Sequence, residues 1–223
     1  MVLEKYEYSL VEPGSGAYAE YLALRHEVFC EELGRIAPDG RKVGGLAIES
    51  DEYDVHSLHV LCRVKSTGTA VGCSRLILPG PKGLNVNARY KLACAPESPA
   101  AQVGEIGRLA LSARLRRHRA EGAHKGGRRH FLSASGESVH SMLKREGPVV
   151  ALGLYREIFN LASRYGITHC YAAMEPALAR LLNRLGFPFH EAGPVNTQVM
   201  PARQPYLIGA QAARAGLAVR NSC

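Results

Sequence analysis

The segment that most constrains the fold is residues 103–111 (VGEIGRLAL), which is almost entirely apolar. A strand with one face in water alternates apolar and polar residues, whereas a strand buried on both faces reads as a nearly continuous apolar run. The segment therefore predicts a central strand. Helices must cover the faces of such a sheet, so we expect an α/β (α+β) fold with one mixed β-sheet flanked by helices.

Alternating apolar and polar residues predict the remaining strands. Residues 58–64 and 71–77 are joined by a tight turn and predict an antiparallel hairpin. Further strands are expected at residues 6–10, 168–174, 187–189 and 206–208.

Helical spacing of apolar residues predicts three helices. The first covers residues 17–33 and ends at Gly34, the second covers residues 149–165, and the third runs from Pro176 to Gly186. The apolar face of the first helix is expected to contain Tyr18, Leu22, Arg25, Phe29 and Leu33.

The composition is that of a globular protein, because 46% of the 223 residues are hydrophobic. No segment is an apolar run of the ~20 residues that a membrane span needs. The first residues also lack the features of a signal peptide. We expect a single domain over residues 1–223 and a cytoplasmic location.

The six cysteines and nine histidines predict neither a disulfide framework nor a metal site. The cysteines are scattered without a CxxC pair, and the histidines lack ligand spacing supported by cysteine or carboxylate partners. We therefore expect buried free thiols, no metal and no permanently bound cofactor.

Positive charge is concentrated in residues 113–130, which contain seven basic residues and one acidic residue. This segment carries most of the net charge of +8, so we expect an acidic partner beside it. Residues 120–130, its glycine-containing part, predict a flexible basic loop.

Two arginines occupy positions that should face the protein interior. Arg25 lies in the apolar stripe of the first helix, and Arg75 lies on the apolar face of the hairpin's second strand. A buried guanidinium keeps its proton, so each needs a carboxylate or an anionic ligand. The acidic residues of the segment 49–54 (ESDEYD) are candidate partners.

The central strand contains a second pair of charges, Glu105 and Arg108. Residues three apart in a regular strand face opposite ways, but a bulge at Gly107 would turn both side chains toward one side. Such a pair is consistent with a functional site and equally with a structural ion pair.

Four motifs together resemble the autoinducer-synthase-like branch of the GNAT superfamily. They are LRHEVFCEELG (24–34), ESDEYD (49–54), GCSRLILP (72–79) and GEIGRLALS (104–112). Their order and spacing are most similar to acyltransferases associated with PEP-CTERM/exosortase systems and to long-chain N-acyl amino acid synthases. The acyl-homoserine-lactone synthases are more distantly similar. The resemblance covers nearly the whole chain, from Tyr6 to the strand around Tyr206.

The resemblance implies a GNAT-type fold in which the central strand splays from its neighbour and the acyl-pantetheine arm lies in the gap. It also implies transfer of a long-chain fatty acyl group from acyl carrier protein to the amine of an amino acid or similar small molecule. Glu105 and Arg108 fall on the splayed strand. Substrate-binding roles fall on Arg25, Phe29, Asp51, Asp54 and Arg75.

Amide formation needs a neutral amine, a polarised thioester and close positioning of the two. Glu105 is the candidate base, directly or through a water. Backbone N–H groups near a bulge would hold the thioester oxygen, so Leu109 joins Glu105 and Arg108 in the expected catalytic set. Two roles stay possible for Arg25, Arg75 and Arg108: they can bind the carboxylate of an amino acid acceptor, or they can pair with Asp51 and Asp54.

The stretch RRHRAEG (116–122) departs from the glycine-rich loop with which most coenzyme A-dependent GNAT enzymes hold the pyrophosphate. It lacks the first glycine and carries several arginines. It therefore suits the acidic surface of acyl carrier protein better than a nucleotide, with acyl-CoA as an alternative donor. The expected docking residues are Arg114, Arg116, Arg117 and Arg119.

Three alternative functions stay open at this point. An acyl-homoserine-lactone synthase is disfavoured by the absence of tryptophan, which those enzymes typically place soon after the first helix. An acetyl-CoA-dependent acetyltransferase is the second alternative. A nucleic-acid-binding module is the third, but the basic segment has no interleaved aromatic residues and no known binding motif, so we expect no nucleic acid partner.

Overall fold

A computed structural model describes residues 3–113, 115 and 146–218 of the chain. These residues form two compact units, each with its own apolar cluster. Unit 1 is drawn from residues 1–51, 59–74 and 108–155, and unit 2 from residues 52–58, 75–107 and 156–223. The expectation of a single domain stays a prediction, and the expected basic loop at residues 120–130 lies outside the described residues.

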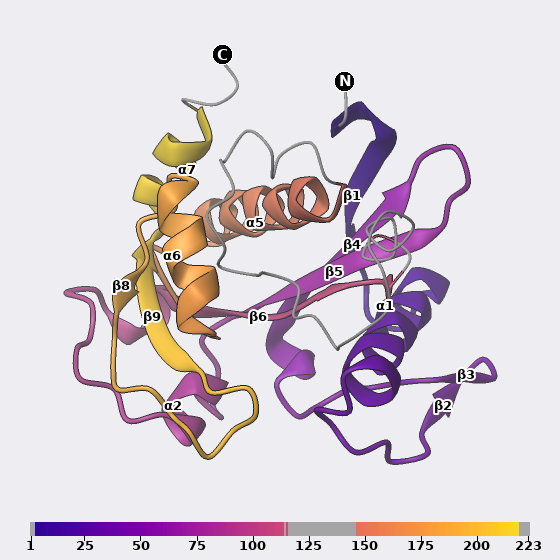
Figure 1. Cartoon of the computed structure of the whole chain (residues 1–223), viewed down its shortest axis with the longest axis horizontal. Helices are drawn as coiled ribbons and strands as arrows, with labels where there is room; N and C mark the ends of the chain where they lie inside the picture. The colour runs from indigo at the N-terminus through magenta and orange to yellow at the C-terminus, as the bar shows by residue number, and fades with distance from the viewer. Residues whose placement is uncertain (1–2, 114, 116–145, 219–223) are drawn as a thin grey trace, which may run out of the picture. The chain divides into compact units, whose positions relative to one another are not determined.

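Seven strands are hydrogen-bonded into a mixed sheet in the order β1-β4-β5-β6-β7-β9-β8 (Figure 1). Their bounds are β1 (Tyr6–Val11), β4 (Ser57–Val64), β5 (Ala70–Ile77), β6 (Val103–Leu111), β7 (His169–Met174), β8 (His190–Glu191) and β9 (Gln204–Gly209). The β1–β4, β7–β9 and β8–β9 pairs are antiparallel, whereas β6 and β7 are parallel. The predicted mixed α/β fold is confirmed, and β6 has the predicted bounds.

The parallel pairing between β6 and β7 is short. It comprises Val103↔His169, Gly104↔Cys170 and Glu105↔Tyr171. Both strands continue beyond the last pair, β6 to Leu111 and β7 to Met174, without further registered pairing. The expectation of splayed central strands is confirmed, with Glu105 at the point where the pairing stops.

Most helices of the described ranges lie between strands along the chain, and α7 follows the last strand, β9 (Figure 1). They are α1 (Gly16–His26), α2 (Asn85–Arg89), α5 (Glu146–Arg164), α6 (Pro176–Arg184) and α7 (Ala210–Ala218). Short helices are η1 (Leu3–Lys5), η2 (Glu27–Glu32), η3 (Asp54–His56) and η4 (Ala100–Gln102). Within the described ranges, no helix has the length and apolar character needed to cross a bilayer.

The first predicted helix is divided into an α-helix and a π-helical segment. The side chain of Ser15 accepts a hydrogen bond from the backbone N–H of Tyr18 and caps α1. The segment η2 then widens into π-helical geometry, with the backbone N–H of Leu33 donating to the carbonyl of Val28. The wider turn rotates later residues away from the core, so Phe29 is buried whereas Leu33 is exposed.

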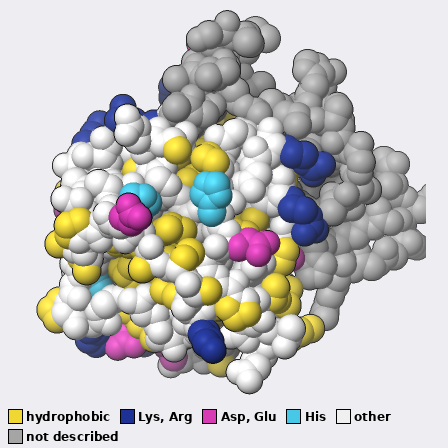
Figure 2. Space-filling view, turned by 90° about the vertical axis from the view of Figure 1, so that its left-hand side faces the viewer, with side chains coloured by type: hydrophobic (Ala, Val, Ile, Leu, Met, Phe, Trp, Pro, Cys, Tyr) yellow, Lys and Arg dark blue, Asp and Glu magenta, His cyan; other side chains and the backbone are white. Residues whose placement is uncertain are grey.

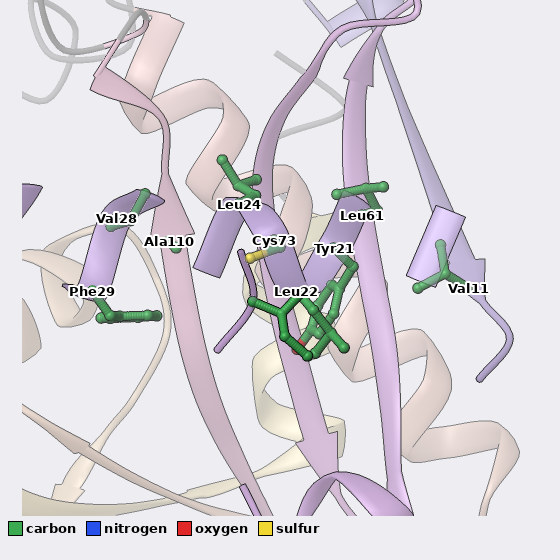
Figure 3. Packing of buried hydrophobic residues seen from close by; sticks show 10 residues of the cluster. Val11, Tyr21, Leu22, Leu24, Val28, Phe29, Leu61, Cys73 and Ala110 are labelled. Carbon is green, nitrogen blue, oxygen red and sulfur yellow. The ribbon is translucent and has the colours of Figure 1, made fainter. Parts of the chain in front are cut away.

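The core of unit 1 joins this helix to the sheet. Tyr21, Leu22 and Leu24 of α1 and Phe29 of η2 belong to one buried cluster with residues of β1, β4, β5 and β6 (Figure 3). A small hairpin of β2 (Lys42–Val43) and β3 (Leu46–Ala47) lies in the same unit, and β3 contacts α1. This packing brings the loop that follows the hairpin close to α1.

Unit 2 departs from the sequence-based prediction at one strand and at helices α2 and α7, neither of which was predicted. The prediction of a strand at residues 187–189 is wrong. The backbone N–H of Phe189 bonds to the Asn183 side chain rather than to a neighbouring strand, and both phenylalanines are buried. The observed strand is β8, directly after them. Helix α2 was not predicted, since its five residues are too few to show a helical apolar pattern.

Candidate active site

Arg25 is the most deeply buried charge of unit 1. Its side chain is fully shielded from solvent, and its Nε donates to Oε2 of Glu49 at 2.6 Å. The guanidinium also lies over the ring of Tyr21, 5.4 Å from the centroid. The burial predicted for Arg25 is therefore confirmed, and its partner is the first carboxylate of the segment 49–54.

Glu49 is shared between two arginines. Arg108 donates to its carboxylate through Nε at 3.1 and 3.3 Å and through Nη2 at 3.0 Å. Burial by itself would raise the pKa of Glu49, but the charge of Arg25 and the hydrogen bonds from Arg108 and Arg25 outweigh this effect. The net result is a pKa below the usual range, so Glu49 is a stable carboxylate at neutral pH.

Arg108 joins Glu49 to Asp51. Its Nη2 donates to Oδ2 of Asp51 at 2.8 Å, and its guanidinium lies 5.7 Å from the ring centroid of Phe29. Its backbone has φ of 51°, the left-handed region that side chains other than glycine rarely adopt. This geometry supports the predicted irregularity of β6 beside Gly107, because a left-handed residue interrupts the pleat of a strand.

Arg75 and Asp54 form a separate ion pair in unit 2. Nη1 of Arg75 donates to Oδ1 of Asp54 at 2.6 Å, and both side chains are almost completely buried. Asp54 begins η3, directly before β4. The burial predicted for Arg75 is confirmed.

Glu105 holds the start of α2. Its Oε2 accepts from the backbone N–H of Val86 at 2.7 Å, and its Oε1 accepts from the Asn85 side chain at 3.1 Å. The first backbone N–H groups of a helix have no partner within the helix, so a carboxylate here satisfies one of them. Glu105 is only 3% exposed and is therefore fixed in orientation.

The structure brings together four of the expected residues in unit 1, namely Arg25, Phe29, Asp51 and Arg108. It adds Glu49, which sequence reasoning had treated only as a candidate ion-pair partner. Its signal in the sequence is its place in the acidic segment 49–54, whose carboxylates are candidate partners of the inward-facing Arg25 and Arg75. Leu109 is half-buried on β6. The proposed docking residues Arg114, Arg116, Arg117 and Arg119 lie outside the described residues.

One face of the molecule, drawn in Figure 2, carries mixed side chains. Figure 2 shows hydrophobic side chains among scattered basic, acidic and histidine side chains on the face that it draws. No group of three or more histidine, cysteine, aspartate or glutamate residues within the described ranges is arranged to hold a metal ion.

Comparisons with known proteins show what the chain is similar to. Residues 24–123 match the family model of the acetyltransferase (GNAT) domain. The chain is 22% identical over 194 residues to the acyl-homoserine-lactone synthase of Vibrio anguillarum, a match that covers 86% of this chain and 85% of that protein.

Two solved structures illustrate the likeness of the fold. TofI, in a ternary complex with an inhibitor and MTA, has a TM-score of 0.65 at 20% identity and covers 96% of both chains. FeeM, an N-acyl amino acid synthase from uncultured soil microbes, has a TM-score of 0.56 at 14% identity, over 95% of this chain and 93% of that chain. The structures show the fold, and the matching domain model is that of an acetyltransferase. The chain is an acyltransferase with a GNAT-like fold.

Proposed function

We propose that the chain transfers a long-chain fatty acyl group from acyl carrier protein to the amine of an amino acid and so makes an N-acyl amino acid. The observation that carries this proposal is the partly exposed pair of Arg108 and Asp51, whose side chains are 20% and 23% exposed. Within the described part of the chain, Nη1 of Arg108 has no hydrogen-bond partner, although Nε and Nη2 are both engaged.

A free amino acid carries a carboxylate and an ammonium group a few atoms apart. Nη1 of Arg108 can donate to the carboxylate, and Asp51 attracts the ammonium group beside it. The neighbouring ion pair of Arg25 and Glu49 is buried, so it cannot offer the same contacts to a substrate. A zwitterionic acceptor therefore fits this pair better than a purely cationic or purely anionic one.

The remaining residues proposed to bind substrate act indirectly, by holding a carboxylate in place, or through apolar contact. Arg25 holds Glu49, and Arg75 holds Asp54, so both arginines fix carboxylate positions. Phe29 covers the Arg108 guanidinium and restricts the space around it.

Glu105 is the proposed base for the reaction. Glu105 first takes a proton from the bound ammonium group and releases it to solvent, which leaves a neutral amine. The amine attacks the thioester carbon, the carbon–sulfur bond breaks, and the second proton lost by nitrogen passes through Glu105 to the leaving thiolate. Backbone N–H groups of Arg108 and Leu109 are proposed to stabilise the oxyanion, and the left-handed φ of Arg108 supports a re-aimed amide there.

Acyl carrier protein is proposed as the donor because of charge. The basic residues Arg114, Arg116, Arg117 and Arg119 follow β6 directly in the chain and would meet an acidic protein surface. The resemblance of the chain's motifs to those of acyltransferases associated with PEP-CTERM/exosortase systems supports the same class of donor and acceptor. The likeness to homoserine-lactone synthases favours one second candidate, acyl transfer to the amine of S-adenosylmethionine.

The test is the product. We expect mass spectrometry of organic extracts from cells producing the chain to show long-chain N-acyl amino acids that are absent with Glu105→Gln, which should lower turnover about 10² to 10⁴-fold. Glutamine keeps an acceptor oxygen for Val86 or Asn85, so the fold should survive, as thermal unfolding can verify. Asn85→Ala is the matched control, because it removes a donor to Glu105 without removing the carboxylate.

Three outcomes would contradict parts of this proposal. Homoserine lactones in place of N-acyl amino acids would favour the second candidate. Normal turnover of Glu105→Gln would remove Glu105 as the base. Purified protein that accepts acyl-CoA but not acylated acyl carrier protein as the donor would contradict the proposed donor.

A further inference from the structure

Arg41 is an exposed arginine of unit 1 with an unusually complete set of contacts. Its Nη1 donates to Oγ of Ser50 at 2.6 Å, and its Nη2 donates to the carbonyl oxygen of Ser50 at 2.7 Å. Its Nε donates to Oδ2 of Asp39 at 2.6 Å. The guanidinium therefore ties the chain before the β2–β3 hairpin to the chain after it.

Ser50 is the residue between the two carboxylates that hold Arg108. Glu49 and Asp51 accept from Nη2 of Arg108 at 3.0 and 2.8 Å. On one side of Ser50, the backbone N–H of Glu49 donates to the carbonyl of Leu22 in α1 at 3.1 Å. Arg41 holds Ser50 itself, so α1 and Arg41 together determine the path of the segment 49–51.

The hairpin does little to hold this segment by itself. Its turn consists of Gly44 and Gly45, which have positive φ, and its paired residues Val43 and Leu46 are 44% and 45% exposed. A segment with few buried apolar contacts opens at low free-energy cost. The bonds of Arg41 to Ser50, together with the bond from the backbone N–H of Ile48 to the Arg41 carbonyl, are polar ties between this loop and the segment 49–51.

We propose that Arg41 is a positioning residue for the acceptor: it holds Ser50 so that Asp51 faces Arg108 in the orientation that an amino acid needs. The inference rests on the proposed function. Arg41 is 52% exposed, and an ion pair at such a position contributes little to global stability because water screens it. Loss of Arg41 should then loosen Asp51 without unfolding the protein.

The experiment compares Arg41→Ala with Arg63→Ala in steady-state acylation assays. Arg63 forms a partly exposed ion pair with Glu20 at 2.7 Å in the same unit, and its bond goes to α1 rather than to the segment 49–51. We expect Arg41→Ala to raise KM for the acceptor about tenfold, less than the roughly 10²-fold loss that a 1 Å misplacement of reacting groups can cause. The donor KM and the thermal midpoint should stay near wild type, and Arg63→Ala should change none of these quantities.

Conservative substitutions separate positioning from charge. Arg41→Lys keeps the positive charge but cannot bind both Ser50 atoms and Asp39, so it should recover only part of the acceptor KM. Ser50→Ala removes the bond to Oγ and keeps the bond to the carbonyl oxygen, so its effect should be smaller than that of Arg41→Ala. In the double variant the two effects should not add, since both report the same contact.

Two results would overturn the inference. One is an acceptor KM for Arg41→Ala within twofold of that for Arg63→Ala. The other is a loss of activity that follows a lowered thermal midpoint with both KM values unchanged. Wild-type protein that makes no N-acyl product would instead overturn the proposed function. In that case amide hydrogen exchange in residues 46–54 tests the role of Arg41 by itself. Faster exchange in Arg41→Ala than in Arg63→Ala would support this role, and equal exchange in both variants would contradict it.

Discussion

At the scale of single residues, the structure is organised by carboxylates that serve buried arginines. Glu49 is the clearest case, because it is 4% exposed and contacts both Arg25 and Arg108. Removing one partner from a buried ion pair leaves an uncompensated charge in a medium that solvates it poorly. The stability of unit 1 should therefore depend on Glu49 more than on any exposed acidic residue.

Glu49→Gln should destabilise the protein by about 3 to 5 kcal/mol at pH 7, because Arg25 keeps its charge and loses its counter-charge. Urea unfolding followed by circular dichroism measures the change. Glu20→Gln is the matched control, since its partner Arg63 is partly exposed, and it should cost less than about 1 kcal/mol. Equal changes in the free energy of unfolding would show that the buried ion pair contributes no more to stability than the partly exposed one.

The same pair makes a defined contribution to acid stability. The pKa of Glu49 is lowered in the folded state, so its stabilisation is complete above the ordinary glutamate value of about 4.3 and is lost as pH falls toward the folded value. Wild-type protein should lose stability more steeply below about pH 4 than Glu49→Gln.

At the scale of elements, close backbone approaches decide where side chains are excluded. In unit 2 the loop after β8 approaches the loop after α2, and the backbone N–H of Ala93 donates to the carbonyl of Ala192 at 2.7 Å. A Cβ added at Gly193 would lie 2.2 Å from the carbonyl oxygen of Lys91. Because this atom belongs to the backbone, a side-chain rotation cannot relieve the clash.

Gly193→Ala should destabilise unit 2 by about 1 to 3 kcal/mol, the usual range for overpacking. Gly16→Ala is the control: a Cβ at this first residue of α1 has open space around it, and alanine favours helix, so stability should be unchanged or slightly higher. Differential scanning calorimetry of both variants gives the comparison. A Gly193→Ala variant as stable as wild type would contradict the close approach.

At the scale of the whole molecule, three free thiols lie inside the two units. Cys62 and Cys73 are buried in unit 1 and Cys170 in unit 2, and burial raises the pKa of each to about 12. The prediction of buried free thiols is confirmed for these residues, whereas Cys94 is exposed. Because the thiolate is the reactive form, the buried thiols should be inert in the folded state.

Alkylation at pH 8 should modify Cys94 rapidly and leave Cys62, Cys73 and Cys170 unmodified until the protein unfolds. Peptide mass spectrometry after timed iodoacetamide treatment measures each site, in a Cys223→Ser background that removes the terminal thiol. Rapid modification of Cys170 in the absence of denaturant would show that unit 2 opens locally.

Much of the fold and part of the site could be predicted from the sequence, because the relevant signals are local. The apolar run of β6, the alternation in β4 and β5, and the helical spacing in α5 are all patterns within a few residues. The same patterns indicated that Arg25 and Arg75 face inward. Short elements escaped prediction, since α2 and β8 have too few residues to show a period.

The sequence by itself determined the longer strands, helices α1, α5 and α6, and the inward direction of Arg25 and Arg75. Only the tertiary structure decided which carboxylate serves which arginine. Glu49 lies 24 residues from Arg25 and 59 residues from Arg108, and no local periodicity relates such distant positions. Their pairing depends on how the helix, the loop and the strand pack, because a buried charge must be neutralised by whichever opposite charge the fold brings within hydrogen-bond distance.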